Sequence, residues 1–335
     1  MMRAFEYASP ATTEQAVALL SATWGHAEVL AGGTDLLSLM KDDVVHPKRL
    51  VNIKQIKEMS VVTAGPKGLR IGALTTLGEL ADNVNVVKDY PALAEAINDA
   101  ASPQIRNMAT IGGNLCQRPR CWYFRGGFGL LPRNESGKDL VTDGENRYHA
   151  ILGNDGPAKF VSPSSIAPVL MAYGAVLRLI GPRGMREQAL ERFYVIPTTE
   201  AEREHDLRPN EILAELVLPP PRELKVAHYE IRQKQAFDWP LAVAAVGLNI
   251  KGSELFGSRL VLGYVAPIPW RSGDGEVALN NAARIHGSIS EEVARAAAEG
   301  ALQSAKPLSH NAYKVQLAKV AVRRAIMKAA SGGAA

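Results

Sequence analysis

The sequence has 335 residues, of which 47% are hydrophobic and 21% are charged, and this composition excludes a disordered chain. Lys and Arg total 38 against 34 for Asp and Glu, so the net charge of +4 excludes the strongly basic character typical of nucleic-acid binding. No apolar run reaches the length of a membrane-spanning helix. From the charge we expect no nucleic acid as a partner, and from the missing apolar run we expect no membrane. The length predicts two or three domains.

The first predicted unit covers residues 1–57. It begins with an extended stretch at 5–8 and a helix that Thr12 or Thr13 caps. A buried strand at 29–31 and another strand at 49–53 follow. These elements predict a small α/β unit.

A first glycine segment, VLAGGTDLLSLMK at residues 29–41, follows the buried strand of this unit. Gly32 and Gly33 allow the backbone to turn sharply and to approach a ligand, and consecutive N–H groups in such a turn form an anion-binding concavity. Thr34 or Asp35 is in position to cap a helix at 36–41, which would place the positive end of that helix at the concavity. The alternative is an ordinary tight turn.

The second predicted unit covers residues 58–221. It contains a strand at 68–73, a helix from Thr75 or Thr76 to residue 81, and a helix at 91–101. A second glycine segment follows, ASPQIRNMATIGGNLCQ, with Gly112 and Gly113. Neither G-x-G-x-x-G nor the Walker pattern is present, which argues against a Rossmann sheet. Two glycine segments predict a pyrophosphate held from both sides by main-chain amides.

The AGGTDLL and SPQIRNMATIGGN motifs resemble the FAD-binding subunit of the molybdenum hydroxylases, a family that includes xanthine dehydrogenase, carbon monoxide dehydrogenase and bacterial aldehyde oxidoreductases. The resemblance implies an α+β fold: a two-subdomain FAD-binding domain of the vanillyl-alcohol-oxidase type, followed by a C-terminal α+β domain. It also implies that FAD is the cofactor. The residues that it implies for FAD binding are Leu30, Ala31, Gly32, Gly33, Thr34, Asp35, Leu36, Ile105, Asn107, Thr110, Gly112, Gly113, Asn114 and Ser165. Ser165 stands where the family commonly has an aspartate, and Arg106 is left unassigned.

Residues 117–159 form a long polar stretch, which we predict to be a loop insertion in the second unit. Its Arg118, Arg120 and Arg125 alternate with aromatic residues at 122–124. Such a pattern is found in sites that stack single-stranded nucleic acid, but we favour a loop pinned by its aromatic residues, with the arginines on acidic neighbours or a partner subunit.

The CWYFR and GENRYHAI stretches of this insertion resemble the aldehyde oxidoreductase branch of the family, where four cysteines hold a 4Fe–4S cluster. Cys121 matches the first of these, and Cys116 is the only other cysteine in the chain. Two thiols cannot build a four-thiolate cluster, so we predict the insertion without its cluster. We expect Cys121 to be a buried structural thiol and Cys116 to pack beside the flavin loop. So few cysteines favour a reducing compartment, the cytoplasm, although co-export to the periplasm with a partner stays open.

The second unit ends with a helix and two strands, and a third unit follows at residues 222–330. Ser164 or Ser165 caps the helix, which runs to 172, the strands lie at 175–180 and 211–218, and the prolines at 219–221 mark a domain seam. In the third unit, strands at 227–234, 241–250 and 259–266 precede helices at 289–305 and 311–330. Phe237 or Trp239 could approach the flavin ring, or pack as an ordinary aromatic residue.

The chain carries no metal-ligand motif, nucleophile elbow or aligned general base, so we predict no catalytic and no metal-binding residue in it. This suits an electron-transfer flavoprotein. The resemblance implies a heterotrimer, in which electrons reach FAD from a small 2Fe–2S subunit and the substrate is oxidised on a large molybdopterin subunit. We expect the substrate to be an aldehyde. The alternatives are a xanthine or heterocycle dehydrogenase, a stand-alone flavin oxidase and a non-catalytic scaffold.

Overall fold

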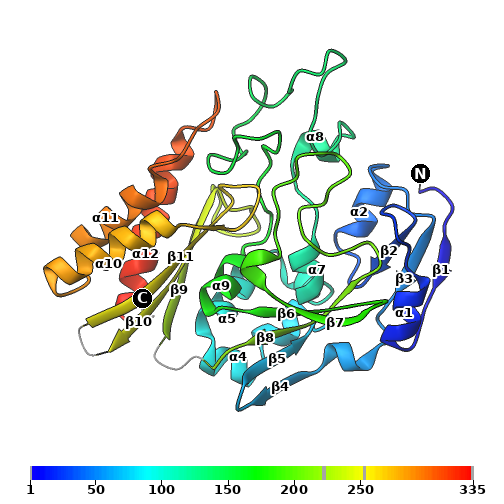
Figure 1. Cartoon of the computed structure of the whole chain (residues 1–335), viewed down its shortest axis with the longest axis horizontal. Helices are drawn as coiled ribbons and strands as arrows, with labels where there is room; N and C mark the ends of the chain where they lie inside the picture. The colour runs from blue at the N-terminus through cyan, green and yellow to red at the C-terminus, as the bar shows by residue number, and fades with distance from the viewer. Residues whose placement is uncertain (1, 221–223, 252–253, 333–335) are drawn as a thin grey trace.

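The computed structural model describes residues 2–220, 224–251 and 254–332, and these form three sheets with helices around them (Figure 1). The first sheet has three parallel strands in the order β1-β3-β2. Its elements are β1 (Glu6–Ala8), α1 (Thr13–Leu19), β2 (Ala27–Leu30), α2 (Leu36–Lys41) and β3 (Arg49–Asn52). Thr12 caps α1, as predicted, because its side chain accepts a hydrogen bond from the Gln15 N–H.

The second sheet is antiparallel, with five strands in the order β4-β5-β8-β6-β7. Its strands are β4 (Val62–Gly65), β5 (Gly68–Gly72), β6 (Val176–Gly181), β7 (Gly184–Ala189) and β8 (Ile212–Leu218). The helices of this part are α3 (Leu77–Ala81), α4 (Val84–Asp89), α5 (Pro91–Asp99), α6 (Pro103–Arg106), α7 (Ile111–Cys116) and α9 (Ile166–Tyr173), with short 3₁₀ turns η1 (Lys57–Ser60) and η2 (Leu190–Arg192). Thr76 caps α3 through a capping box with Glu79.

The third sheet is also antiparallel, in the order β12-β11-β10-β9. Its strands are β9 (Leu224–Ile231), β10 (Ala242–Lys251), β11 (Glu254–Gly263) and β12 (Trp270–Arg271), and its helices are α10 (Gly273–His286), α11 (Glu291–Leu302) and α12 (Tyr313–Ala330). Alternate residues of β10 face opposite layers: Ala245 joins the core of the preceding domain, while Ala244 and Val246 join the core beneath the helices. The third sheet therefore lies between the helices α10–α12 and the rest of the molecule (Figure 1).

The insertion contains one short helix, α8 (Trp122–Arg125), and otherwise runs as irregular chain between the third-sheet domain and the first sheet (Figure 1). Some of its buried residues, including Phe124 and Leu130, form a separate apolar cluster with Leu39 of α2, while Ile151 and Leu152 join the core of the third-sheet domain. It is therefore packed against the body of the protein, and its aromatic residues contribute to that packing.

Helix α10 was not predicted from the sequence. Its beginning, SGDGE, resembles a loop, yet Ser272 caps it by accepting from the Gly275 N–H. A Cβ at Gly275 would lie 2.9 Å from the Ala301 Cβ, so the glycine permits close contact between α10 and α11. The helix was not predicted because its early glycine is required by contact with α11, and the local sequence pattern does not show that contact. The predicted domain boundary at residue 221 lies outside the described residues.

The helices include none that could cross a lipid bilayer: over the residues described, no helix is both long enough and apolar enough.

Candidate functional site

The two glycine segments pack directly against each other. A Cβ at Gly32 would overlap the backbone carbonyl of Met108, so a side chain at this position cannot be accommodated without moving the backbone. On the other side, a Cβ at Gly112 would lie 2.7 Å from the Ala73 Cβ. The absence of a side chain at Gly32 brings together two stretches that are about 75 residues apart in the sequence, whereas Gly112 packs against Ala73, which belongs to neither segment.

The first segment leaves its main-chain amides free. Gly33 adopts the left-handed conformation, with φ of 76°, and no described group accepts a hydrogen bond from the N–H groups of Gly33, Thr34 or Asp35. These residues are partly exposed and lie on the wall of a cavity. Free amides in a turn of this kind form the concavity that the sequence predicts for an anion.

The second segment differs from its prediction. Gly112 and Gly113 lie in the first turn of α7 instead of a loop, and their amides are already used. Gly112 donates to the Ala73 carbonyl at 2.9 Å, and Gly113 donates to the Thr110 side chain at 3.1 Å. The prediction that both segments offer amides to one pyrophosphate is therefore wrong for Gly112 and Gly113. Thr110 caps a helix where the sequence suggested a tight turn.

A continuous cleft follows the junction of the two segments. It consists of two cavities of about 160 Å³ each, which share Thr34, Asp35, Gly113 and Gln117 as wall residues. The predicted site residues that line it are Ala31, Gly32, Gly33, Thr34, Asp35, Leu36, Ile105, Thr110, Gly113, Asn114 and Ser165.

Three predicted site residues lie beside the cleft and do not line it. Leu30 is buried in an apolar cluster with Met40, and the Gly112 backbone contacts Ala73. Asn107 lies against Gly78 of α3. Their assignment to FAD stays a prediction.

Asp35 anchors the insertion and does not cap α2. Its carboxylate accepts from the Arg118 N–H at 2.8 Å and from the Arg125 guanidinium at 2.7 Å, and lies 3.2 Å from Arg120. It makes no side-chain bond to the α2 backbone. Arg118 also pairs with Glu204 at 2.9 Å. The arginines of the insertion thus lie on acidic neighbours, the arrangement that we favoured over nucleic-acid stacking.

Ser164, and not Ser165, caps α9. The Ser164 hydroxyl accepts from the Ala167 N–H and donates to the Asn114 side chain at 2.6 Å, which fixes the orientation of Asn114. Ser165 is left on the wall of the cleft, beside Tyr264. Arg106 points away and donates to the carbonyls of Asn98 and Ala100 at the end of α5, so its role is structural.

Apart from Trp239, the residues at the two ends of the cleft were not predicted from the sequence. One end is lined by Trp24, Glu28, Arg203 and His205, where Arg203 pairs with Glu28 at 2.8 Å and stacks over Trp24. Burial lowers the pKa of His205 to about 4, so its ring is neutral at neutral pH. No local pattern marks these residues, because they are brought together only by the fold.

The other end of the cleft is lined by Asp99, Glu230, Trp239 and Tyr264. Burial raises the pKa of Glu230 to about 7. Trp239 is the aromatic residue that reaches the cleft, with Arg120 stacked over its ring at 5.0 Å, whereas Phe237 is 72% exposed and does not line it. This end is therefore built jointly by the second-sheet and third-sheet domains.

The two cysteines are separate, and both are free. The Cys121 sulfur lies 3.1 Å from the His149 Nε2, in the insertion, and burial raises the pKa of this thiol. Cys116 lies at the end of α7 on the wall of the cleft, where burial raises its pKa to about 12. Both thiols are thus protonated at neutral pH. The absence of an iron–sulfur cluster from this chain stays a prediction.

Comparison with known proteins agrees with this geometry. Residues 3–221 match the family model described as FAD binding domain in molybdopterin dehydrogenase, and residues 227–329 match the CO dehydrogenase flavoprotein C-terminal domain. The chain belongs to this family. The proteins of this family are oxidoreductase subunits. The family resemblance that the two glycine motifs indicated is confirmed.

Several relatives in this family match along nearly the whole chain. The FAD-binding subunit PaoB of the Escherichia coli aldehyde oxidoreductase is 32% identical over 95% of this chain and 96% of its own length. The medium chain of carbon monoxide dehydrogenase from Hydrogenophaga pseudoflava is 29% identical over 96% of each chain. A solved structure of the carbon monoxide dehydrogenase from that organism superposes with a TM-score of 0.76, at 27% identity and over all of both chains. The predicted fold class, an FAD-binding domain with a C-terminal α+β domain, is confirmed.

Proposed function

We propose that this chain binds FAD in the cleft between the two glycine segments and acts as the electron-transfer subunit of a molybdenum hydroxylase that oxidises aldehydes. The observation that carries the proposal is the cleft itself. Its wall includes Gly33, Thr34 and Asp35, whose amides are free, together with residues of the second segment. When bound, a flavin supplies one- and two-electron redox chemistry.

The residues of this chain would bind the cofactor and exclude water from it. The amides of Gly33, Thr34 and Asp35 are placed to donate to the diphosphate, and Thr110 and Asn114 lie on the facing wall. The missing Cβ at Gly32 lets the two walls come into contact at Met108, at the junction that the cleft follows. Trp24, beside Arg203, is placed for the adenine end, and Ile105 and Trp239 are placed for the ring end.

The proposed reaction takes place on three chains. A large molybdopterin subunit would oxidise the substrate, a small 2Fe–2S subunit would relay the electrons, and this chain would deliver them from FAD to an external acceptor. The aldehyde is proposed because PaoB belongs to an aldehyde oxidoreductase and because the CWYFR and GENRYHAI stretches resemble that branch. We also propose a cytoplasmic location, on the cysteine count alone.

The experiment has two stages. The isolated chain should be yellow, and its FAD should be retained on gel filtration and lost in Gly32→Ala. Coexpression with a small 2Fe–2S chain and a large molybdopterin chain encoded beside this one should then give a complex whose FAD absorbance is bleached by an aldehyde under anaerobic conditions. A colourless chain would support the scaffold alternative, and bleaching of the isolated chain by an aldehyde would support a stand-alone oxidase.

A second candidate is a xanthine or heterocycle dehydrogenase. It is favoured by a 28% match to the Escherichia coli O157:H7 xanthine dehydrogenase FAD-binding subunit, over 98% of this chain. Bleaching of the complex by xanthine, and not by aldehydes, would select it.

A further inference from the structure

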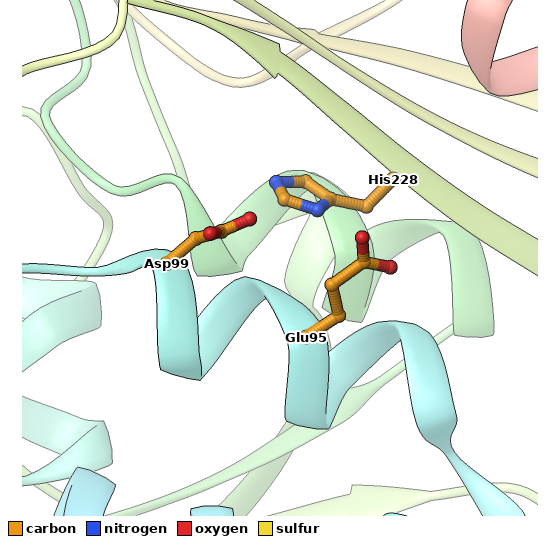
Figure 2. Close-up of side chains that lie close together, drawn as sticks. All are labelled: Glu95, Asp99 and His228. Carbon is orange, nitrogen blue, oxygen red and sulfur yellow. The ribbon is translucent and has the colours of Figure 1, made fainter. Parts of the chain in front are cut away.

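A buried histidine lies between two carboxylates where the second-sheet and third-sheet domains meet. Glu95 and Asp99 are one helical turn apart on α5, and His228 comes from β9. Figure 2 shows both carboxylates turned toward the imidazole. One ligand atom of each residue lies within 4.8 Å of the other two, and no other group of three His, Cys, Asp or Glu side chains meets this criterion in the part of the chain that the structure describes.

The imidazole has nothing to bond to in the protein. His228 is only 1% exposed, yet neither of its ring nitrogens has a hydrogen-bond partner. Buried polar atoms are nearly always paired, because an unpaired one loses its hydration without compensation. Both carboxylate oxygens of the adjacent Glu230 are also buried without a hydrogen-bond partner, and one of them lies 3.9 Å from the His228 Nε2. Glu230 is still held by an ion pair, because Arg232 lies 3.3 Å from its Oε1. The two ring nitrogens of His228 have no such partner, which indicates that another group fills this site.

The charges around the histidine favour a cation. Three carboxyl groups, Glu95, Asp99 and Glu230, face two basic groups. Lys328 of α12 pairs with Glu95, and Arg232 pairs with both Asp99 at 3.0 Å and Glu230 at 3.3 Å. The set has an excess of acidic groups, and each basic group reaches a carboxylate and leaves the imidazole unpaired. An anion would meet three carboxylates, so it is disfavoured.

We propose that Glu95, Asp99 and His228 bind a divalent cation of the zinc class. One imidazole and two carboxylates make a three-ligand set that zinc accepts. Glu230, facing the His228 Nε2, is placed to accept the ring N–H and so to orient the imidazole, which leaves Nδ1 for the ion. The ion would join α5 to β9 across the domain boundary, directly behind the end of the cleft that Asp99 and Glu230 line.

The test is Zn²⁺ binding by the full chain, measured by equilibrium dialysis with metal analysis and by the rise in Tm. We expect about one tightly held Zn²⁺ per chain, with affinity reduced roughly tenfold or more in His228→Gln. All proteins carry Cys121→Ser, because the Cys121–His149 pair is the other place with two soft ligands. Co²⁺ substitution should then give visible bands without thiolate charge transfer.

A matched control uses the exposed pair of His286 and Glu292, 3.9 Å apart on the surface. His286→Gln should leave the tight site unchanged. Lys328→Met removes the ammonium that competes for Glu95, so it should strengthen Zn²⁺ binding. Absence of tight binding in the Cys121→Ser parent chain, an affinity in His228→Gln equal to that of this parent, or no gain in Lys328→Met would each overturn the proposal. The Lys328 variant tests the site even if His228→Gln fails to fold.

Discussion

The two glycine segments that meet at the cleft use their glycines for different purposes. In the first, Gly33 is left-handed and its neighbours keep their amides free, so the segment offers donors to a ligand. In the second, Gly112 and Gly113 begin a capped helix and their amides are used internally, so the segment offers a closely packed wall. Similar sequence patterns thus give one anion-binding turn and one packing surface.

The difference shows that a glycine pair in a sequence can indicate a position where a Cβ is excluded. It does not indicate which neighbouring atoms exclude it. At Gly32 the obstacle is the backbone of Met108, which belongs to the other segment. At Gly113 the only nearby atom is the Thr110 hydroxyl oxygen, which would lie 3.0 Å from an added Cβ. Substitutions at these positions should therefore have unequal effects, and the following predictions run from the largest to the smallest.

Gly32→Ala should have the largest effect. Its methyl group would force the two segments apart, at a cost of about 3 kcal/mol or more in the free energy of unfolding, and the bound FAD should be lost. Urea unfolding and flavin content measure the two effects. Gly113→Ala is the matched control and should change stability by less than about 1 kcal/mol, since alanine also favours the helix. Equal losses in the two variants would contradict the distinction.

Asp35→Asn should have the next largest effect, because Asp35 joins the first segment to the insertion. Removing its charge weakens the bonds from Arg125 and the Arg118 amide, and should cost about 2 kcal/mol. The insertion should then become more sensitive to limited proteolysis. Asp42→Asn, at an exposed position directly after the same segment, should behave like the wild type. If Asp35 were only a helix cap, Asp35→Ser would restore stability.

Thr110→Ala should have a smaller effect, confined to the second segment. It removes the side chain that accepts from the Gly113 N–H, which should cost about 1 kcal/mol of stability. Thr110→Ser retains the hydroxyl and should recover most of that loss, as measured by urea unfolding. A loss of similar size in both variants would mean that packing of the Thr110 methyl group, and not the cap, is responsible.

Cys116, at the end of the same helix, should react slowly with thiol reagents. Burial raises its pKa to about 12, and the thiolate is the reactive form, so alkylation in the folded chain should keep rising between pH 8 and pH 10. In urea the rate should level off above about pH 8.5, the ordinary pKa of a cysteine. Mass spectrometry of the Cys116 peptide measures both profiles. A plateau near pH 8.5 in the folded chain would mean that the cleft leaves this thiol open to solvent.

Much of the local structure could be predicted because short-range signals decided it. Thr12 and Thr76 cap helices where their positions indicated, and the strand at 49–53 is found at Arg49–Asn52. The missed helix α10 and the helical start of α7 have the same cause. Glycines in their first turns read as loop signals, whereas in the folded chain they allow close approach of another element.

The sequence by itself determined the family, the FAD-binding fold and eleven cleft residues, because long motifs and glycine positions can be read directly from the order of the residues. Only the tertiary structure decided which amides stay free, that Asp35 binds arginines instead of capping a helix, and that Trp239 reaches the cleft and Phe237 does not. It alone placed His228 between Glu95 and Asp99. The physical reason is that hydrogen bonds and ion pairs depend on distances between atoms that lie tens to hundreds of residues apart, and those distances exist only once the chain has folded.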